Sequence, residues 1–475
     1  MFDELINSVS EYEKQNTHPD KWRPHFHLCS TTGWISDPNG LCVFKDKIHM
    51  FYQYTPFNVA PVSTNFWGHY TTLDYINYTA HKPALCCDSK YDANGVFSGS
   101  AYINNDVMNI FYTGNVEHEG NYDYITAGRE HNTMLITSTD GFTFSKKRLV
   151  MQNSDYPENV TCHVRDPKVF KYNDKLYMVL GARRKDDVGE ALLYTSSDFL
   201  EWKQINTFNS VEPFGFMWEC PDIFSLDDKT FLSFSPQGVS ADGSLYNNVC
   251  QSGYSVISND IDNDGSVTNF TEYDRGFDFY APQTFTDNIG RRIMLAWSGL
   301  PGIEDYYENP SKHLGWIHCL CMPRILTEKN GHIIQTPLPE FEKLRTDFSE
   351  HQCRSSLDIT GYDTFEAEIE NIKASKDVCI SFSDDCKIEY SNNVLCLSFG
   401  KSGYGRTKRS VELSSLESIH IFCDCSIVEI FVNDGYEVFT SRFYPEFTSD
   451  VISMRGLDAD IKLYRLNSFT ITQDY

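Results

Sequence analysis

The sequence predicts an all-β protein in which an N-terminal five-bladed β-propeller is followed by a C-terminal β-sandwich. A segment of about sixty residues recurs five times in the first two thirds of the chain, as the blades of a propeller do. These repeats lack the long 3.6-residue periodicity of helices. The last part of the chain instead alternates polar and apolar residues, which is typical of the strands of a sandwich.

Each repeat joins two short apolar runs across a turn. Asp, Asn and Gly occupy the turn, because they tolerate positive φ or hydrogen-bond as a turn does. The five copies read DPNGLCVFKDKIHMFYQY from Asp37, SGSAYINNDVMNIFYTG from Ser98, RDPKVFKYNDKLYMVLGA from Arg165, ECPDIFSLDDKTFLSFS from Glu219 and YAPQTFTDNIGRRIMLAW from Tyr280. Such a unit fits one four-stranded blade, whereas a sandwich of the same length would not need a regular period.

The same patterns predict where the parts of the chain begin and end. We expect an N-terminal extension at 1–24, the propeller at 25–334, a linker at 335–347 and the sandwich at 348–475. Within the last range, the tripeptide Asn-Asp-Gly at 433–435 separates two alternating runs and predicts a hairpin.

Composition excludes several classes of protein. The net charge of −26 argues against nucleic acid or an anionic membrane as partner, since both require compensating Lys and Arg. The sequence contains no run of 18 apolar residues, so we expect no membrane helix, and the N-terminus has no signal-peptide pattern. The fifteen scattered cysteines fit buried thiols in a reducing compartment, so we expect a cytoplasmic protein.

Three carboxylates occupy the heads of three repeats. Innermost strands of a propeller start near one face of its central channel, so Asp37, Asp166 and Glu219 should converge there. Carboxylates that meet in a pocket with aromatic residues fit the hydrolysis of glycosidic bonds. Metal binding is the other option, but hard-cation sites draw several ligands from one loop, so we expect no metal and no cofactor.

An ordered set of motifs resembles glycoside hydrolase family 32, the β-fructofuranosidases, which include the bacterial sucrose and sucrose-6-phosphate hydrolases. The motifs include WISDPNG, FYQYTPF, WGHYTTLD, NGVFSGSA, HVRDPKVF, MWECPDIF and DRGFDFYAPQTF. The resemblance implies a retaining mechanism in which Asp37 is the nucleophile and Glu219 the general acid and base, while Asp166 stabilises the transition state. It implies substrate-binding positions at Trp34, Ser36, Gln53, Trp67, Phe97, Ser98, Arg165, Tyr280 and Trp297.

The sequence leaves several alternatives open. The family has Asn where this chain has Ser36, which leaves open whether fructosyl units pass to water or to another sugar. The other hypotheses are an inverting glycosidase and a non-catalytic fructan-binding protein. The expected partner is a small sugar, namely sucrose, its 6-phosphate or a short fructan, bound by a monomer or homodimer. A 6-phosphate needs cations at the pocket rim, and Arg129, Lys168 and Arg183 are the candidates.

Overall fold

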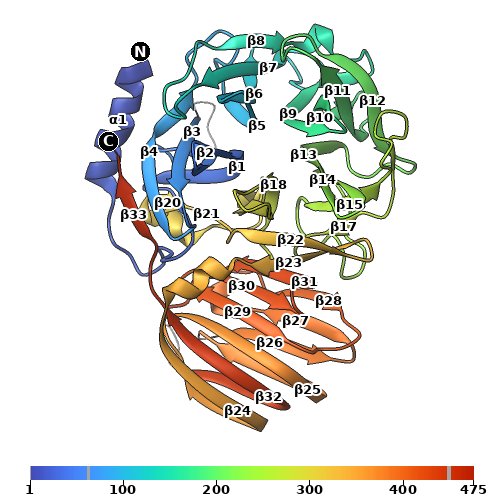
Figure 1. Ribbon diagram of the computed structural model, residues 1–475. Coiled ribbons are helices and arrows are strands. Elements are labelled where there is room, and N and C mark those ends of the chain that lie inside the picture. The colour runs from blue at the N-terminus through green and yellow to red at the C-terminus, as the bar shows by residue number, and fades with distance from the viewer. Residues whose placement is uncertain (1, 61–64, 384, 447–450, 475) are drawn as a thin grey trace.

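The structure is a computed structural model that describes residues 2–60, 65–383, 385–446 and 451–474. Strands dominate these ranges (Figure 1). The described helices are α1 (Phe2–Asn16) and the short 3₁₀ segments η1 (Asn153–Asp155), η2 (Ile303–Asp305), η3 (Pro310–Leu314), η4 (Pro339–Leu344) and η5 (Lys401–Gly403). None of the helices in this part of the chain is long and apolar enough to cross a membrane.

Small sheets in a propeller-like arrangement form the N-terminal part, which lies in the upper half of Figure 1. The first sheet contains β1 (Gly33–Phe44), β2 (Lys47–Thr55), β3 (Phe66–Thr72) and β4 (Asn77–Cys86), flanked by β20 (Trp316–Ile317) and β33 (Thr470–Gln473). The second contains β5 (Val96–Asn104), β6 (Val107–Glu117), β7 (Arg129–Ser138) and β8 (Arg148–Met151).

The remaining small sheets follow in chain order around the ring (Figure 1). One contains β9 (Val160–Tyr172), β10 (Lys175–Arg184), β11 (Gly189–Ser196), β12 (Lys203–Ser210) and β16 (Ser266–Val267). The next contains β13 (Met217–Leu226), β14 (Lys229–Gln237), β15 (Gly253–Ile257) and β17 (Thr271–Glu272). The last contains β18 (Tyr280–Thr286), β19 (Arg292–Ser298), β21 (Cys319–Leu320), β22 (Arg324–Lys329) and β23 (His332–Pro337).

The first two strands of each small sheet form an antiparallel hairpin, as the repeats predict. Type I′ turns place both central residues at positive φ and match the twist of the flanking strands. Both turn residues have positive φ in three of these hairpins, at Lys45–Asp46 (51° and 63°), Asn105–Asp106 (49° and 59°) and Asn173–Asp174 (45° and 63°). The Asn and Asp residues of the repeats therefore mark real turns.

A nine-stranded, sandwich-like sheet forms the C-terminal part in the lower half of Figure 1. Its strands are β24 (Arg345–Thr360), β25 (Thr364–Phe382), β26 (Cys386–Ser391), β27 (Val394–Ser398), β28 (Lys408–Glu412), β29 (Ile419–Asp424), β30 (Ile427–Val432), β31 (Glu437–Arg442) and β32 (Val451–Leu466). The Asn-Asp-Gly tripeptide turns the chain between β30 and β31, which confirms the predicted hairpin. Phe365, Ile380 and Ile421 belong to the core of this part.

Both ends of the described chain cover the first small sheet (Figure 1). The helix α1 contacts β4, and Ile6 and Val9 are buried in the core of that sheet. The last strand, β33, pairs with β4 in parallel, so residues 470–473 lie outside the sandwich although the predicted range of 348–475 includes them. The predicted linker contains the end of β23, the segment η4 and the first residues of β24.

Buried charges join the two parts of the molecule. The Arg324 side chain on β22 is 1% exposed and pairs with Asp274 at 3.1 Å and with Glu429 on β30 at 2.7 Å. His27 contacts carboxylates with both ring nitrogens, with Asp424 2.8 Å from Nδ1 and Glu429 3.2 Å from Nε2. Because unpaired buried charges are costly, this network fixes the sandwich against the propeller-like part.

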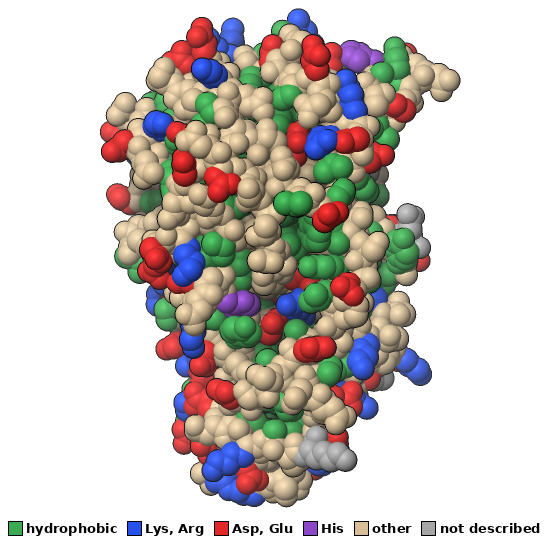
Figure 2. All heavy atoms as spheres, turned by 90° about the vertical axis from the view of Figure 1, so that its right-hand side faces the viewer, with side chains coloured by type: hydrophobic (Ala, Val, Ile, Leu, Met, Phe, Trp, Pro, Cys, Tyr) green, Lys and Arg blue, Asp and Glu red, His purple; other side chains and the backbone are tan. Residues whose placement is uncertain are grey.

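Acidic and basic side chains are interspersed over the face shown in Figure 2, with apolar side chains between them. This surface agrees with the excess of acidic over basic residues in the composition.

Candidate active site

A cavity of about 510 Å³ opens where the innermost strands of the small sheets begin. The sequence-predicted residues that line it are Trp34, Ser36, Asp37, Gln53, Phe97, Ser98, Arg165, Asp166, Glu219, Tyr280 and Trp297. They come from strands of all the small sheets, so residues more than two hundred positions apart share one cavity.

A β-bulge at the same point of the innermost strands turns these residues inward. In each bulge, two residues of the innermost strand lie opposite a single residue of the next strand. The bulges are Ser36–Asp37 opposite Gln53, Asp166–Pro167 opposite Leu180, Cys220–Pro221 opposite Phe234 and Ala281–Pro282 opposite Ala296. In the second sheet the pairing shifts at Ser98. Bulges re-aim side chains next to active sites, and they are among the few places where a sheet accepts proline. Asp166, Cys220 and Ala281 also share a positive φ, of 63°, 48° and 49°.

Asp37 on β1 is half-buried and accepts a hydrogen bond at Oδ2 from Ser98 Oγ, 2.7 Å away on β5. Burial raises the pKa of Asp37 to about 6, and the negative charge of Glu219 adds to this effect. The hydrogen bond from Ser98 lowers that pKa because it favours the ionised form. At neutral pH the carboxylate is therefore ionised and poorly hydrated.

Asp166 on β9 is 4% exposed and is held by hydrogen bonds at its side chain and at its backbone amide. The amide of Cys220 donates to Asp166 Oδ2 at 2.9 Å, and the amide of Asp166 donates to Thr113 Oγ1 at 2.9 Å. Burial raises the pKa of Asp166 to about 7; Arg165 lowers it, and the charges of Glu219 and Asp37 raise it further. The carboxyl groups of three sheets thus influence one another electrostatically.

Glu219 on β13 accepts hydrogen bonds at both oxygens. Its Oε1 accepts from Arg165 Nε at 3.1 Å and Nη2 at 2.7 Å. Its Oε2 accepts from Gln237 Nε2 at 2.6 Å and from the Tyr280 hydroxyl at 2.5 Å. Donors from three neighbouring strands therefore fix the orientation of this carboxylate.

Arg165 is itself oriented by a histidine. Its Nη1 donates to His163 Nδ1 at 2.8 Å, and His163 Nε2 lies 3.0 Å from the carbonyl of Tyr124. Burial, with the charge of Arg165, lowers the pKa of His163 to about 3. The ring is therefore neutral, with its proton on Nε2, and it acts as an acceptor that positions the guanidinium.

Aromatic and amide side chains form the walls of the cavity. The rings of Trp34 and Trp297 lie 5.7 Å apart. Gln53 is held by its Nε2, which donates to the carbonyl of Val96 at 3.0 Å. Trp67 does not line the cavity: its ring is fully buried, and its Nε1 donates to the carbonyl of Phe97 at 3.2 Å. It supports the wall from behind instead of facing the space inside.

Of the other lining residues, all but Tyr54 come from outside the repeated motifs. These other residues are Tyr54, Thr55, Asn65, Asn94, Asn115, Glu117, Arg129, Pro301, Gly302 and Glu304. Of the three cations considered for a phosphate, Arg129 lines the cavity. Lys168 and Arg183 are not among the described lining residues: Lys168 pairs with buried Asp222 at 3.0 Å, and Arg183 pairs with Asp187 at 2.6 Å. The β6–β7 register makes Glu117 and Arg129 neighbours, and the sequence does not show this register because residues 118–128 separate the two strands.

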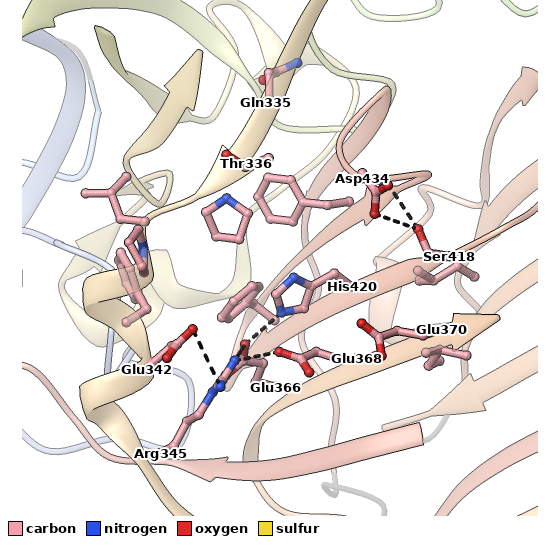
Figure 3. A pocket seen from close by; sticks show the side chains of 18 residues that line it. Gln335, Thr336, Glu342, Arg345, Glu366, Glu368, Glu370, Ser418, His420 and Asp434 are labelled. Carbon is pink, nitrogen blue, oxygen red and sulfur yellow. Dashed lines mark hydrogen bonds and ion pairs between the residues drawn. The ribbon is translucent and has the colours of Figure 1, made fainter. Parts of the chain in front are cut away.

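A second cavity, of about 290 Å³, lies between η4 and the strands β25 and β29 (Figure 3). The ligand atoms of Glu366, Glu368 and His420 lie within 4.8 Å of one another there, close enough to hold a metal ion. Arg345 already pairs with Glu366 at 2.6 Å and with Glu368 at 2.7 Å. A cation would have to displace this guanidinium, so we interpret the cluster as structural.

The chain is similar to characterised enzymes over nearly its whole length. It is 37% identical to the sucrose-6-phosphate hydrolase of Bacillus subtilis, covering 92% of each chain, and 35% identical to that of Vibrio alginolyticus, covering 95% of this chain and 92% of the relative. Among solved structures, a GH32 beta-fructofuranosidase of Bombyx mori matches with a TM-score of 0.85 at 26% identity, covering 99% of this chain and all of that one. Together with the acid-lined cavity, these similarities define a glycoside hydrolase.

Two family models match successive parts of the chain. The model of the glycosyl hydrolases family 32 N-terminal domain matches residues 27–337, and the model of the family 32 C-terminal domain matches residues 371–471. The protein therefore belongs to glycosyl hydrolase family 32, as the motifs indicate.

Proposed function

We propose that this protein is a retaining β-fructofuranosidase that hydrolyses sucrose-type substrates and releases fructose. The observation that carries the proposal is the meeting of Asp37, Asp166 and Glu219, from three separate sheets, in one cavity walled by tryptophans. Relatives that are named for the hydrolysis of sucrose 6-phosphate, and a Bombyx mori variant solved in complex with sucrose, support the substrate class.

In the first step Asp37 attacks the anomeric C2 of the fructosyl unit. Ser98 holds Oδ2, so we assign the attack to Oδ1. A bond forms between this oxygen and C2 while the bond from C2 to the leaving oxygen breaks, and Glu219 gives its proton to that oxygen. A retaining mechanism requires the two carboxyl groups to lie about 5–5.5 Å apart. Both carboxyl groups line the same cavity, as such a mechanism needs.

In the second step water replaces the leaving group. Glu219 takes a proton from the water, whose oxygen bonds to C2 and releases the Asp37 carboxylate. Asp166 lies deep in the cavity and accepts hydrogen bonds from hydroxyls of the fructosyl unit, which stabilises the positively charged transition state. Arg165 keeps Glu219 in position through both steps.

Transfer of the fructosyl unit to a second sugar is the competing outcome of the second step. Ser36 lines the cavity directly before Asp37, at the position where the family has Asn. A serine hydroxyl is shorter than an asparagine amide, and a single oxygen replaces the separate NH₂ donor and carbonyl acceptor of the amide, so it holds an incoming molecule differently. Counting free glucose and free fructose separately measures this transfer, because transfer leaves less free fructose than glucose.

We also propose that the small sheets are the blades of a five-bladed propeller, since each contains one of the five sequence repeats at β1, β5, β9, β13 and β18. We place the enzyme in the cytoplasm, because all fifteen cysteines are free thiols, which persist in a reducing compartment.

The test of the proposed function is incubation of the purified protein with sucrose, sucrose 6-phosphate and 1-kestose. We expect release of fructose from at least one of them, and loss of release in Asp37→Ala. If none releases fructose, or if Asp37→Ala is as active as the wild type, the proposed function is wrong.

A further inference from the structure

Two charged residues face each other at the mouth of the cavity. Glu117 ends β6, Arg129 begins β7, and the two are paired in the register of this hairpin. Thr113 pairs with Phe97 next to the bulge, and Glu117 lies four residues further along β6. At about 3.3 Å per residue, this places the pair about 13 Å from the level of the bulge. Glu117 and Arg129 therefore line the outer part of the cavity.

The outer part of the cavity faces the leaving group. The proposed function, on which this inference rests, puts the fructosyl unit against Asp37 at the level of the bulge. The group that departs from C2 then extends toward the mouth, where Glu117 and Arg129 lie. In sucrose this group is an uncharged glucosyl unit. In the 6-phosphate it carries a phosphate of about −1.5 to −2 charges at neutral pH.

The charges that line the cavity disfavour a phosphate. The carboxyl groups that line the cavity belong to Asp37, Glu117, Asp166, Glu219 and Glu304, and the guanidinium groups belong to Arg129 and Arg165. Arg165 is bound to Glu219, and Arg129 Nη2 lies 2.5 Å from Glu117 Oε1. The arginine that could meet a phosphate at the mouth is thus already neutralised.

We propose that the Glu117–Arg129 pair makes this enzyme prefer an uncharged leaving group, and that Glu117 determines this specificity by neutralising Arg129. Sucrose and other neutral β-fructosides are then better substrates than their phosphorylated counterparts. Arg129 is only 19% exposed and its Nη2 is paired with Glu117, so a phosphate that approaches this guanidinium also meets the negative charge of Glu117.

The test compares kcat/KM for sucrose and sucrose 6-phosphate in the wild type, Glu117→Gln and Glu130→Gln. Glu130 follows Arg129 on β7, lies outside the described lining of the cavity and contacts His118 at 2.9 Å. Its substitution removes the same charge without freeing Arg129, so it is the matched control. We expect the wild type to favour sucrose at least ten-fold, and Glu117→Gln to shift the ratio at least ten-fold toward the phosphorylated sugar.

A double variant shows whether Arg129 mediates the shift. We expect Glu117→Gln combined with Arg129→Gln to return the ratio toward the wild-type value, because the freed cation is then absent. A wild type that prefers the 6-phosphate would overturn the proposal. So would equal shifts in Glu117→Gln and Glu130→Gln, no shift in either, or a double variant that keeps the full shift of Glu117→Gln.

Product inhibition of the wild type tests the same point if the variants do not fold. We expect glucose to inhibit sucrose hydrolysis at a concentration at least ten-fold lower than glucose 6-phosphate; the reverse order overturns the proposal. Failure to release fructose from either sugar refutes the proposed function itself, whereas a reversed ratio refutes only this inference.

Discussion

Ser98 Oγ on β5 donates a hydrogen bond to Asp37 Oδ2 on β1, 2.7 Å away, and so links the second sheet to the first at the proposed nucleophile. This bond counteracts the burial and the charge of Glu219, both of which raise the pKa of Asp37. It favours the ionised form of the carboxylate, and in the proposed mechanism it leaves Oδ1 as the attacking oxygen.

We expect Ser98→Ala to raise the pKa of Asp37 further above about 6, because the variant loses the bond that favours the ionised form. The acid limb of the profile of kcat/KM against pH should move to higher pH, and kcat/KM at pH 6 should fall by about ten-fold. Ser100→Ala is the matched control, since Ser100 Oγ donates to the carbonyl of Pro167 instead. An acid limb that stays in place in Ser98→Ala would contradict this role.

Asp37 should limit the stability of the protein at high pH. Its pKa rises from 3.8 in the unfolded chain to about 6 in the folded protein, so folding favours the protonated form. The stability from this difference is present below pH 3.8 and is lost as pH rises through about 6. We expect Asp37→Asn to raise Tm at pH 8 relative to the wild type, with a much smaller gain at pH 4.5. Calorimetry at both pH values measures this, and an equal or lower Tm of the variant at pH 8 would contradict it.

An external nucleophile that needs no general base should restore part of the activity lost when Glu219 is replaced. We expect Glu219→Ala to lower kcat for sucrose by about 10²–10⁴-fold, because the leaving oxygen then departs without a proton. Azide needs no general base, so it should restore turnover of an activated fructoside and give fructosyl azide. Activity of Glu219→Ala that is near the wild-type value, or that azide leaves unchanged, would rule out this role.

His27 should stabilise the contact between the two parts in a pH-dependent way. Burial lowers its pKa, but hydrogen bonds to Asp424 and Glu429 outweigh this, so the pKa lies above 6.5. A raised pKa stabilises the fold fully below pH 6.5, and this stabilisation is lost as pH rises through the folded value. We expect His27→Gln to lower the free energy of unfolding by about 3 kcal/mol at pH 5.5 and by less at pH 9. His18→Gln is the control, since His18 is exposed. A loss of equal size at both pH values would contradict the account.

The sequence reveals the repeats because strand, turn and strand recur locally, and it reveals the acids because they head the repeats. The repeats alone do not predict the bulges that turn the acids inward, but the Asp-Pro, Cys-Pro and Ala-Pro dipeptides at 166, 220 and 281 indicate them. Proline inside an apparent central strand indicates a bulge, because a regular ladder needs its missing N–H.

Other features depend on long-range packing that no local pattern encodes. Trp67 lies in a strand that is buried along its whole length, so the sequence does not show which way its ring points. The return of residues 470–473 to the first sheet is a pairing across nearly four hundred positions, between β33 and β4. Arg129 lies beside Glu117 because the β6–β7 register pairs the two residues, and this register is not evident in the sequence because residues 118–128 separate the strands.

The central claim is that Asp37 forms a covalent bond to the substrate. Mass spectrometry of peptides from acid-quenched Glu219→Ala, after reaction with an activated fructoside, tests it most directly. We expect a peptide that carries one fructosyl unit on Asp37. A fructosyl unit on Asp166, or no adduct while the leaving group is still released, would contradict it.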